Sequence, residues 1–119
     1  MENKFLYEKL TILIVLFNEE SEIILKTLEK IIPFKKIIID NANNRELKKE
    51  IETKYKIDKY VLNKKNIGFS AGYNQAIKLC ETEFSLILNP DCIIGTHDIN
   101  LLFNSINKYD KCFFTTPLS

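Results

Sequence analysis

The chain has 119 residues, 45% of them hydrophobic, which indicates one modest folded domain rather than a disordered segment. A formal net charge of +1, with lysines interleaved among glutamates, gives no strong field and argues against a nucleic-acid partner. No apolar run reaches the ~18–20 residues that span a bilayer, and the start of the chain has no signal-peptide pattern. The three cysteines lack CxxC spacing and the one histidine lacks a Cys or His neighbour, so neither disulfides nor zinc is indicated and a reducing cytoplasm fits best.

Apolar runs rich in β-branched residues alternate with amphipathic stretches along the chain. Residues 11–17 form the first run, and its continuity is typical of a strand buried on both faces, as in a parallel sheet. An amphipathic helix follows, with Pro33 as its stop signal. The same pattern then predicts strands at 36–40, 60–62, 84–88 and 112–116 and helices at 45–55, 69–80 and about 99–106. This alternation predicts an α/β fold with a mostly parallel sheet and helices on both faces.

Residues 1–119 are expected to form a single domain, because no linker, low-complexity segment or repeat interrupts the alternation. The last predicted strand, 112–116, is followed only by Pro117-Leu118-Ser119. Since a domain often ends in an element that covers its last strand, we expect this domain to be incomplete, as the front part of something larger.

Polar side chains follow each of the first four predicted strands. They are Asn18 and Glu19, then Asp40 and Asn41, then Asn63, Lys65, Asn66 and Gly68, and finally Asn89 and Asp91. Ligands of open α/β sheets bind beyond the carboxyl ends of the strands, which meet at one edge. Amides and one carboxylate there could read a base edge and ribose hydroxyls, and a second carboxylate could hold a divalent cation on a diphosphate. No glycine-rich phosphate loop occurs, so side chains and a metal would have to hold a nucleotide.

Each of these residues also has an ordinary structural explanation. Asn18 can cap the first helix, and Asp40-Asn41 can form an Asx-turn. Gly68 can supply a positive φ in a tight turn, and Asp91 after Pro90 can begin a turn. For any one residue the structural explanation is the better one. Their coincidence at four consecutive strand ends is what favours a ligand.

Four stretches in this order resemble family 2 glycosyltransferases, especially the rhamnosyltransferase-like branch. They are TILIVLFN, IIIDNAN, NKKNIGFSAGYNQAIK and LILNPDC, and the most telling is the pattern Asn-x-Gly-x-x-x-Gly-x-Asn at 66–74. The similarity spans residues 11 to about 103. It implies the Rossmann-like, nucleotide-binding half of a GT-A fold. It also implies inverting transfer of a sugar from a UDP- or dTDP-sugar donor to a glycan or lipid-linked acceptor.

The resemblance implies a role for particular residues. Nucleotide binding would fall to Phe17, Asn18, Glu19, Asp40, Asn63, Asn66, Gly68, Gly72 and Asn89. Asp40 would meet the pyrimidine edge, and Gly72 would permit close helix packing or ligand approach. Asp91 would be the last acid of the family's metal-binding D-x-D, with Asn89 in place of the first, and so the main protein anchor for Mg²⁺ or Mn²⁺. The catalytic base would lie beyond Ser119, because no acid in residues 96–119 lies in a matching motif.

Two other interpretations stay open. The chain could be a non-catalytic module that self-associates or binds a partner through its open sheet edge. It could also be a receiver-like signalling domain with Asp40 as phosphate acceptor, although no late-strand lysine follows. For the enzyme, peripheral association of the full-length protein with the inner face of a bacterial membrane is kept open as well.

Overall fold

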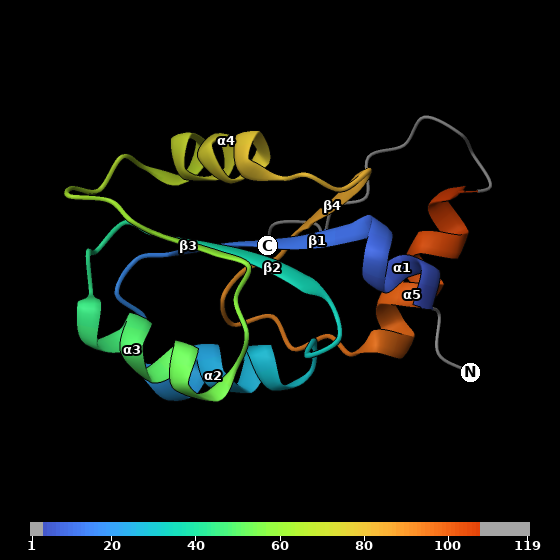
Figure 1. The fold of residues 1–119 in the computed structure, drawn as a ribbon, viewed down its shortest axis with the longest axis horizontal. Coiled ribbons are helices and arrows are strands. Elements are labelled where there is room, and N and C mark those ends of the chain that lie inside the picture. The colour runs from blue at the N-terminus through green and yellow to red at the C-terminus, as the bar shows by residue number, and fades with distance from the viewer. Residues whose placement is uncertain (1–3, 108–119) are drawn as a thin grey trace.

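A four-stranded sheet with the order β3-β2-β1-β4 organises the protein, which a computed structural model describes over residues 4–107 (Figure 1). The strands are β1 (Leu10–Leu16), β2 (Lys35–Asp40), β3 (Lys59–Leu62) and β4 (Phe84–Ile87). All three pairings are parallel, with Thr11 opposite Lys35, Leu10 opposite Phe84 and Ile37 opposite Lys59. The chain runs outward from β1 to β3 and then returns to the other side of β1, so the strand order reverses between β1 and β4.

Helices cover both faces of this sheet, as predicted (Figure 1). They are α1 (Lys4–Lys9), α2 (Ser21–Glu29), α3 (Arg45–Lys54), α4 (Phe69–Leu79) and α5 (Thr96–Asn107). Buried residues of α1, α2, α3 and α5 share one apolar cluster, and α4 packs on the opposite face against a second cluster. No helix within residues 4–107 has the length and apolar composition that a bilayer crossing requires.

β1 explains why the first apolar run is continuous. All of its residues are buried. Ile12, Ile14 and Leu16 belong to the cluster on the α2 face, whereas Leu13 and Val15 belong to the cluster on the α4 face. Because side chains alternate along a strand, a central strand between two helical layers is buried on both faces, and every residue of β1 except Thr11 is apolar. The predicted α/β, Rossmann-like fold is therefore confirmed, with an all-parallel sheet in the described part.

Three local features differ from the sequence-based prediction. Helix α1 was not predicted, and α2 ends at Glu29, earlier than the stop at Pro33, because tighter backbone bonds such as Ile31 N to Leu28 O (3.1 Å) replace helical ones. Ile77 is an apolar residue of the predicted helix 69–80, but it is 46% exposed. The predicted strand 112–116 lies outside the described residues.

Lys36 is a buried charged residue on β2, only 2% exposed. Its ammonium group donates to the carbonyls of Ile32 (3.0 Å) and Phe34 (2.8 Å), which belong to the turn after α2. Burial lowers the pKa of Lys36 to about 8, while the charge of Asp58 acts in the opposite direction. Lys36 therefore satisfies carbonyls that the end of the helix leaves open.

Candidate functional site

A cleft of about 290 Å³ lies where the strand order reverses, beyond the carboxyl ends of β1 and β4. Its lining comes from both strand ends and from helices α2 and α4: Val15, Phe17, Glu19, Ile23, Phe69, Tyr73, Asn89, Pro90 and Asp91. Such a reversal leaves a crevice at the carboxyl ends of the two adjacent strands, here between α2 on one face of the sheet and α4 on the other. The structure thus brings together four residues that the sequence assigned to a site: Phe17, Glu19, Asn89 and Asp91.

The cleft has aromatic walls that are open to solvent. Phe17 is 37% exposed and Phe69 is 41% exposed. The Phe69 ring packs at an angle on Tyr73, with ring centroids 4.7 Å apart. Exposed aromatic faces of this kind suit contact with a planar ring. Phe69 was predicted only as the first residue of the helix 69–80, and its position directly after Gly68 is the signal that could have placed it at the strand ends.

Two carboxylates line the same cleft. Glu19 folds back, and its Oε1 accepts a hydrogen bond from the Phe17 backbone N–H at 2.5 Å. Asp91 is exposed, and its carboxylate makes no hydrogen bond or ion pair within residues 4–107. No group of three or more His, Cys, Asp or Glu side chains that could hold a metal occurs in the described part of the chain. Asp91 nevertheless fits a divalent cation, since Mg²⁺ is commonly held by one or two carboxylates together with substrate phosphates and water.

Asp40 lies outside the cleft lining and is fully buried. Its Oδ1 accepts from the Ala42 N–H at 2.8 Å and its Oδ2 from the Asn44 N–H at 3.1 Å. The Asx-turn explanation therefore describes what Asp40 does in this structure. A phosphate acceptor must be reachable, so this burial argues against the receiver-like interpretation.

Asn63 is engaged by other side-chain amides. It exchanges two hydrogen bonds with Gln75, at 3.0 and 3.1 Å, and donates to Asn41 Oδ1 at 2.8 Å. Asn41 in turn donates to the Gly68 carbonyl at 3.1 Å. This amide network ties the ends of β2 and β3 to α4 and to the loop that precedes it. Asn63 thus shapes the loop instead of facing the cleft.

The backbone geometry of the Asn66–Asn74 motif depends on Asn66, Gly68 and Gly72. Asn66 Oδ1 accepts from the Gly68 N–H at 2.8 Å, and Gly68, the N-cap residue of α4, has a φ of 91°. A Cβ atom at Gly72 would lie 3.0 Å from Cγ1 of Val15. Gly72 therefore lets α4 lie close against β1, which is the first of the two roles expected for it.

Asn18 does not cap α2. The N-cap position is Glu20, without a side-chain hydrogen bond, and Asn18 has a φ of 72°. Its Oδ1 accepts from the Asn44 amide at 3.3 Å. Asn18 is exposed beside the cleft without being part of its lining.

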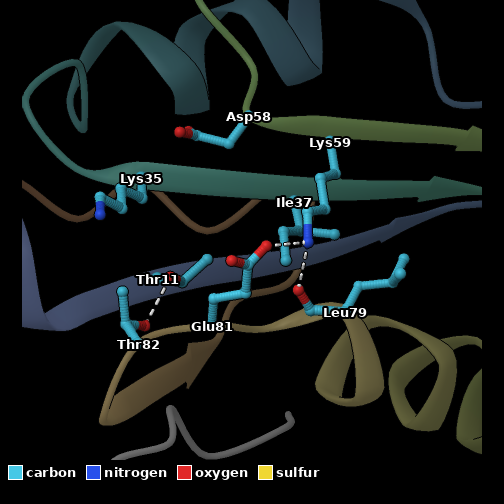
Figure 2. Close-up of a pocket in the computed structure, with 8 residues that line it drawn as sticks. All are labelled: Thr11, Lys35, Ile37, Asp58, Lys59, Leu79, Glu81 and Thr82. Atoms are coloured by element: carbon cyan, nitrogen blue, oxygen red, sulfur yellow. Dashed lines mark hydrogen bonds and ion pairs between the residues drawn. The ribbon is translucent and has the colours of Figure 1, made fainter.

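A second cavity, of about 260 Å³, lies at the opposite, amino edge of the sheet (Figure 2). Several of its polar groups bind one another: Lys59 Nζ donates to the Leu79 carbonyl at 2.8 Å and to Glu81 at 2.5 Å, as Figure 2 shows. The hydroxyls of Thr11 and Thr82 lie 2.6 Å apart. The hydrogen bond from Lys59 lowers the pKa of Glu81. With these groups already engaged, the amino-edge cavity is the weaker candidate for a ligand.

Comparison with known protein families assigns most of the chain to a family. Residues 11–117 match the family model described as Glycosyl transferase family 2. Neither the curated proteins nor the solved structures contain a match to the chain. The matched range includes every residue of the carboxyl-edge cleft, so the family assignment and the geometry concern the same part of the molecule.

Proposed function

The chain belongs to glycosyl transferase family 2, and from this premise we propose that its carboxyl-edge cleft binds the nucleoside-diphosphate sugar donor of a glycosyl transfer. Family membership implies a nucleotide-sugar donor and an acceptor. The finer statement, that a UDP- or dTDP-sugar reacts with inversion and a glycan or lipid-linked molecule accepts the sugar, is part of the proposal. So is membership of the rhamnosyltransferase-like branch, which Asn89 supports by standing where the family's D-x-D has its first acid.

One observation carries the proposal: the exposed carboxylate of Asp91 and the exposed rings of Phe17 and Phe69 line one cleft at the switch point of a parallel sheet. Aromatic faces can stack on a pyrimidine base, and an acid at the other side can hold a cation beside the diphosphate. Enzymes of this family often use divalent cations. A Mg²⁺ or Mn²⁺ ion held by Asp91 and assisted by Asn89 would neutralise charge on the diphosphate as it leaves.

The remaining predicted residues are assigned supporting roles. Asp40 holds the loop after β2 through its two backbone hydrogen bonds, and Asn63 holds the loop after β3. Gly68 and Gly72 set the start and the closeness of α4. These residues give the cleft its shape, whereas the two exposed rings and the two acids that line it make the direct contacts. Within residues 4–107 we assign no catalytic base, because the two acids of the cleft, Glu19 and Asp91, are assigned to binding the donor and its cation.

Calorimetric titration of the chain with UDP and dTDP in the presence of Mn²⁺ tests this function. We expect one of the two nucleotides to bind, and Asp91→Asn to weaken binding at least about tenfold, which is the effect of ~1.4 kcal/mol. Asp98→Asn is the matched control, because Asp98 is an exposed acid of α5 outside the cleft lining. Absence of binding by both nucleotides, or equal affinities for the wild type and Asp91→Asn, would refute the proposed site.

A further inference from the structure

The turn that carries Asp91 is held by hydroxyl groups from both faces of the sheet. Thr27, on α2, has its Oγ1 2.5 Å from the Pro90 carbonyl oxygen. Tyr73, on α4, donates its hydroxyl to the Leu88 carbonyl at 3.0 Å. Helices α2 and α4 cover opposite faces of the sheet (Figure 1), so the segment 88–91 is hydrogen-bonded to both helical layers.

Three consecutive peptide groups before Asp91 are fixed in this way. The Leu88 carbonyl accepts from Tyr73, the Asn89 carbonyl accepts from the Cys92 N–H at 3.0 Å, and the Pro90 carbonyl accepts from Thr27. The orientation of the Pro90 peptide sets the direction in which the Asp91 side chain leaves the backbone. Pro90 itself cannot anchor the turn through an N–H, because proline has none.

Core packing alone does not require either hydroxyl. Thr27 is fully buried between the apolar neighbours Ile24 and Leu28 on α2, where apolar packing makes no use of a hydroxyl group. A buried hydroxyl is costly unless it is hydrogen-bonded. Thr27 Oγ1 also lies 3.3 Å from the Ile23 carbonyl, but the contact with Pro90 is the shorter one.

Tyr73 remains a hydrogen-bond donor at neutral pH. It is 3% exposed, and burial raises its pKa to about 12, against the opposing effect of a backbone hydrogen bond from Val15. A phenylalanine would fill the same space and leave the Leu88 carbonyl without this donor. Loss of one partner from a buried hydrogen bond costs more than the bond itself contributes.

We propose that Thr27 and Tyr73 are positioning residues that aim the Asp91 carboxylate at the cation of the donor complex. This inference rests on the proposed function. Residues that orient a metal ligand through its hydrogen-bonded surroundings commonly change metal affinity about 10–100-fold when they are replaced. The hydroxyl groups of Thr27 and Tyr73 would thus influence how tightly the site binds the metal. They would do so without contacting the donor.

The test compares Thr27→Val, Tyr73→Phe and the rescue variant Thr27→Ser. Thr53→Val is the matched control, because Thr53 donates to the Lys49 carbonyl one helical turn back (2.7 Å) on α3, far from the turn. The measured quantity is the Mn²⁺ concentration that gives half-maximal binding of the nucleotide found to bind. We expect it to rise about tenfold for Thr27→Val and Tyr73→Phe, and to return to the wild-type value for Thr27→Ser. Nucleotide affinity at saturating Mn²⁺ should change less than threefold.

Hydrogen–deuterium exchange of the segment 88–95, measured without any ligand, tests whether the two hydroxyl groups restrain this segment, independently of nucleotide binding. We expect faster exchange in Thr27→Val and Tyr73→Phe and no change in Thr53→Val. Unchanged exchange, or a Thr27→Ser variant that behaves as Thr27→Val does, would overturn the positioning role while wild-type nucleotide binding stands. A wild-type chain that binds neither UDP nor dTDP would instead overturn the proposed function, and the positioning role with it.

Discussion

At the amino edge of the sheet Lys59 is held by Glu81 and by the Leu79 carbonyl, whereas at the carboxyl edge the Asp91 carboxylate faces a cleft and pairs with nothing in residues 4–107. The two cavities are similar in size, about 260 and 290 Å³. They differ in whether the polar groups are already used by the fold. We therefore expect mutations at the amino edge to change stability and mutations of the carboxyl-edge acid to change binding.

The largest effect is expected where the carboxyl-edge cleft depends on close packing. In Gly72→Val the new side chain meets Val15, because even a Cβ would lie 3.0 Å from Val15 Cγ1. We expect the free energy of unfolding to fall by about 3 kcal/mol in urea titrations, together with nucleotide binding. Ala71→Val places the same side chain at an exposed position of α4 and should cost about 0.5 kcal/mol. Equal losses for the two variants would mean that α4 does not need this close contact.

A smaller effect is expected from the titration of Lys36, which concerns stability alone. Its folded-state pKa of about 8 lies below the ordinary 10.5, so the unfolded chain binds more protons between these two values. The free energy of unfolding should therefore rise with pH across this window, by on the order of 2 kcal/mol, relative to Lys36→Met. Urea titrations from pH 7.5 to about 10.5 measure it. Lys35→Met, at an exposed neighbouring position, should keep the wild-type slope, and a Lys36→Met variant with the same slope would contradict the assignment.

The smallest effect is expected at the ion pair of the amino edge. Lys59→Met removes an exposed pair and one bond to a carbonyl, and should lower Tm by less than about 4 °C. Nucleotide affinity should stay at the wild-type value, in contrast to Asp91→Asn, which should keep the wild-type Tm. If Lys59→Met lost nucleotide affinity as Asp91→Asn does, the assignment of binding to the carboxyl edge alone would be contradicted.

Sequence patterns were sufficient for the elements that depend on long apolar periodicity. The run at 11–17 identified the central strand, because only a strand covered on both faces needs an unbroken apolar sequence. Helix α1 was missed because its six residues bury only Leu6, which is too short a pattern for helical periodicity to show. Asp91 was found because it lies just beyond the end of the fourth strand of the alternating pattern.

The division of labour among the polar residues could not be read from sequence. Asp40 is the last residue of β2 and Asp91 lies a few residues after β4, yet the Asp40 carboxylate accepts from two backbone N–H groups whereas Asp91 is exposed. Which N–H groups reach a carboxylate depends on the path of the loop backbone, and sequence patterns do not specify it. Phe69 was hidden for a similar reason, because a helical stripe does not distinguish the core from the rim of a cleft.

The amide pair of Asn63 and Gln75 has a consequence for how this sequence can change over generations. The two residues are 12 positions apart and exchange two hydrogen bonds. Replacing either one with an apolar residue leaves the other with unmet polar groups, whereas replacing both can be nearly neutral. A first change at one position therefore favours a second at the other. Among descendants of this sequence we expect the two positions to vary together, as a linked trait.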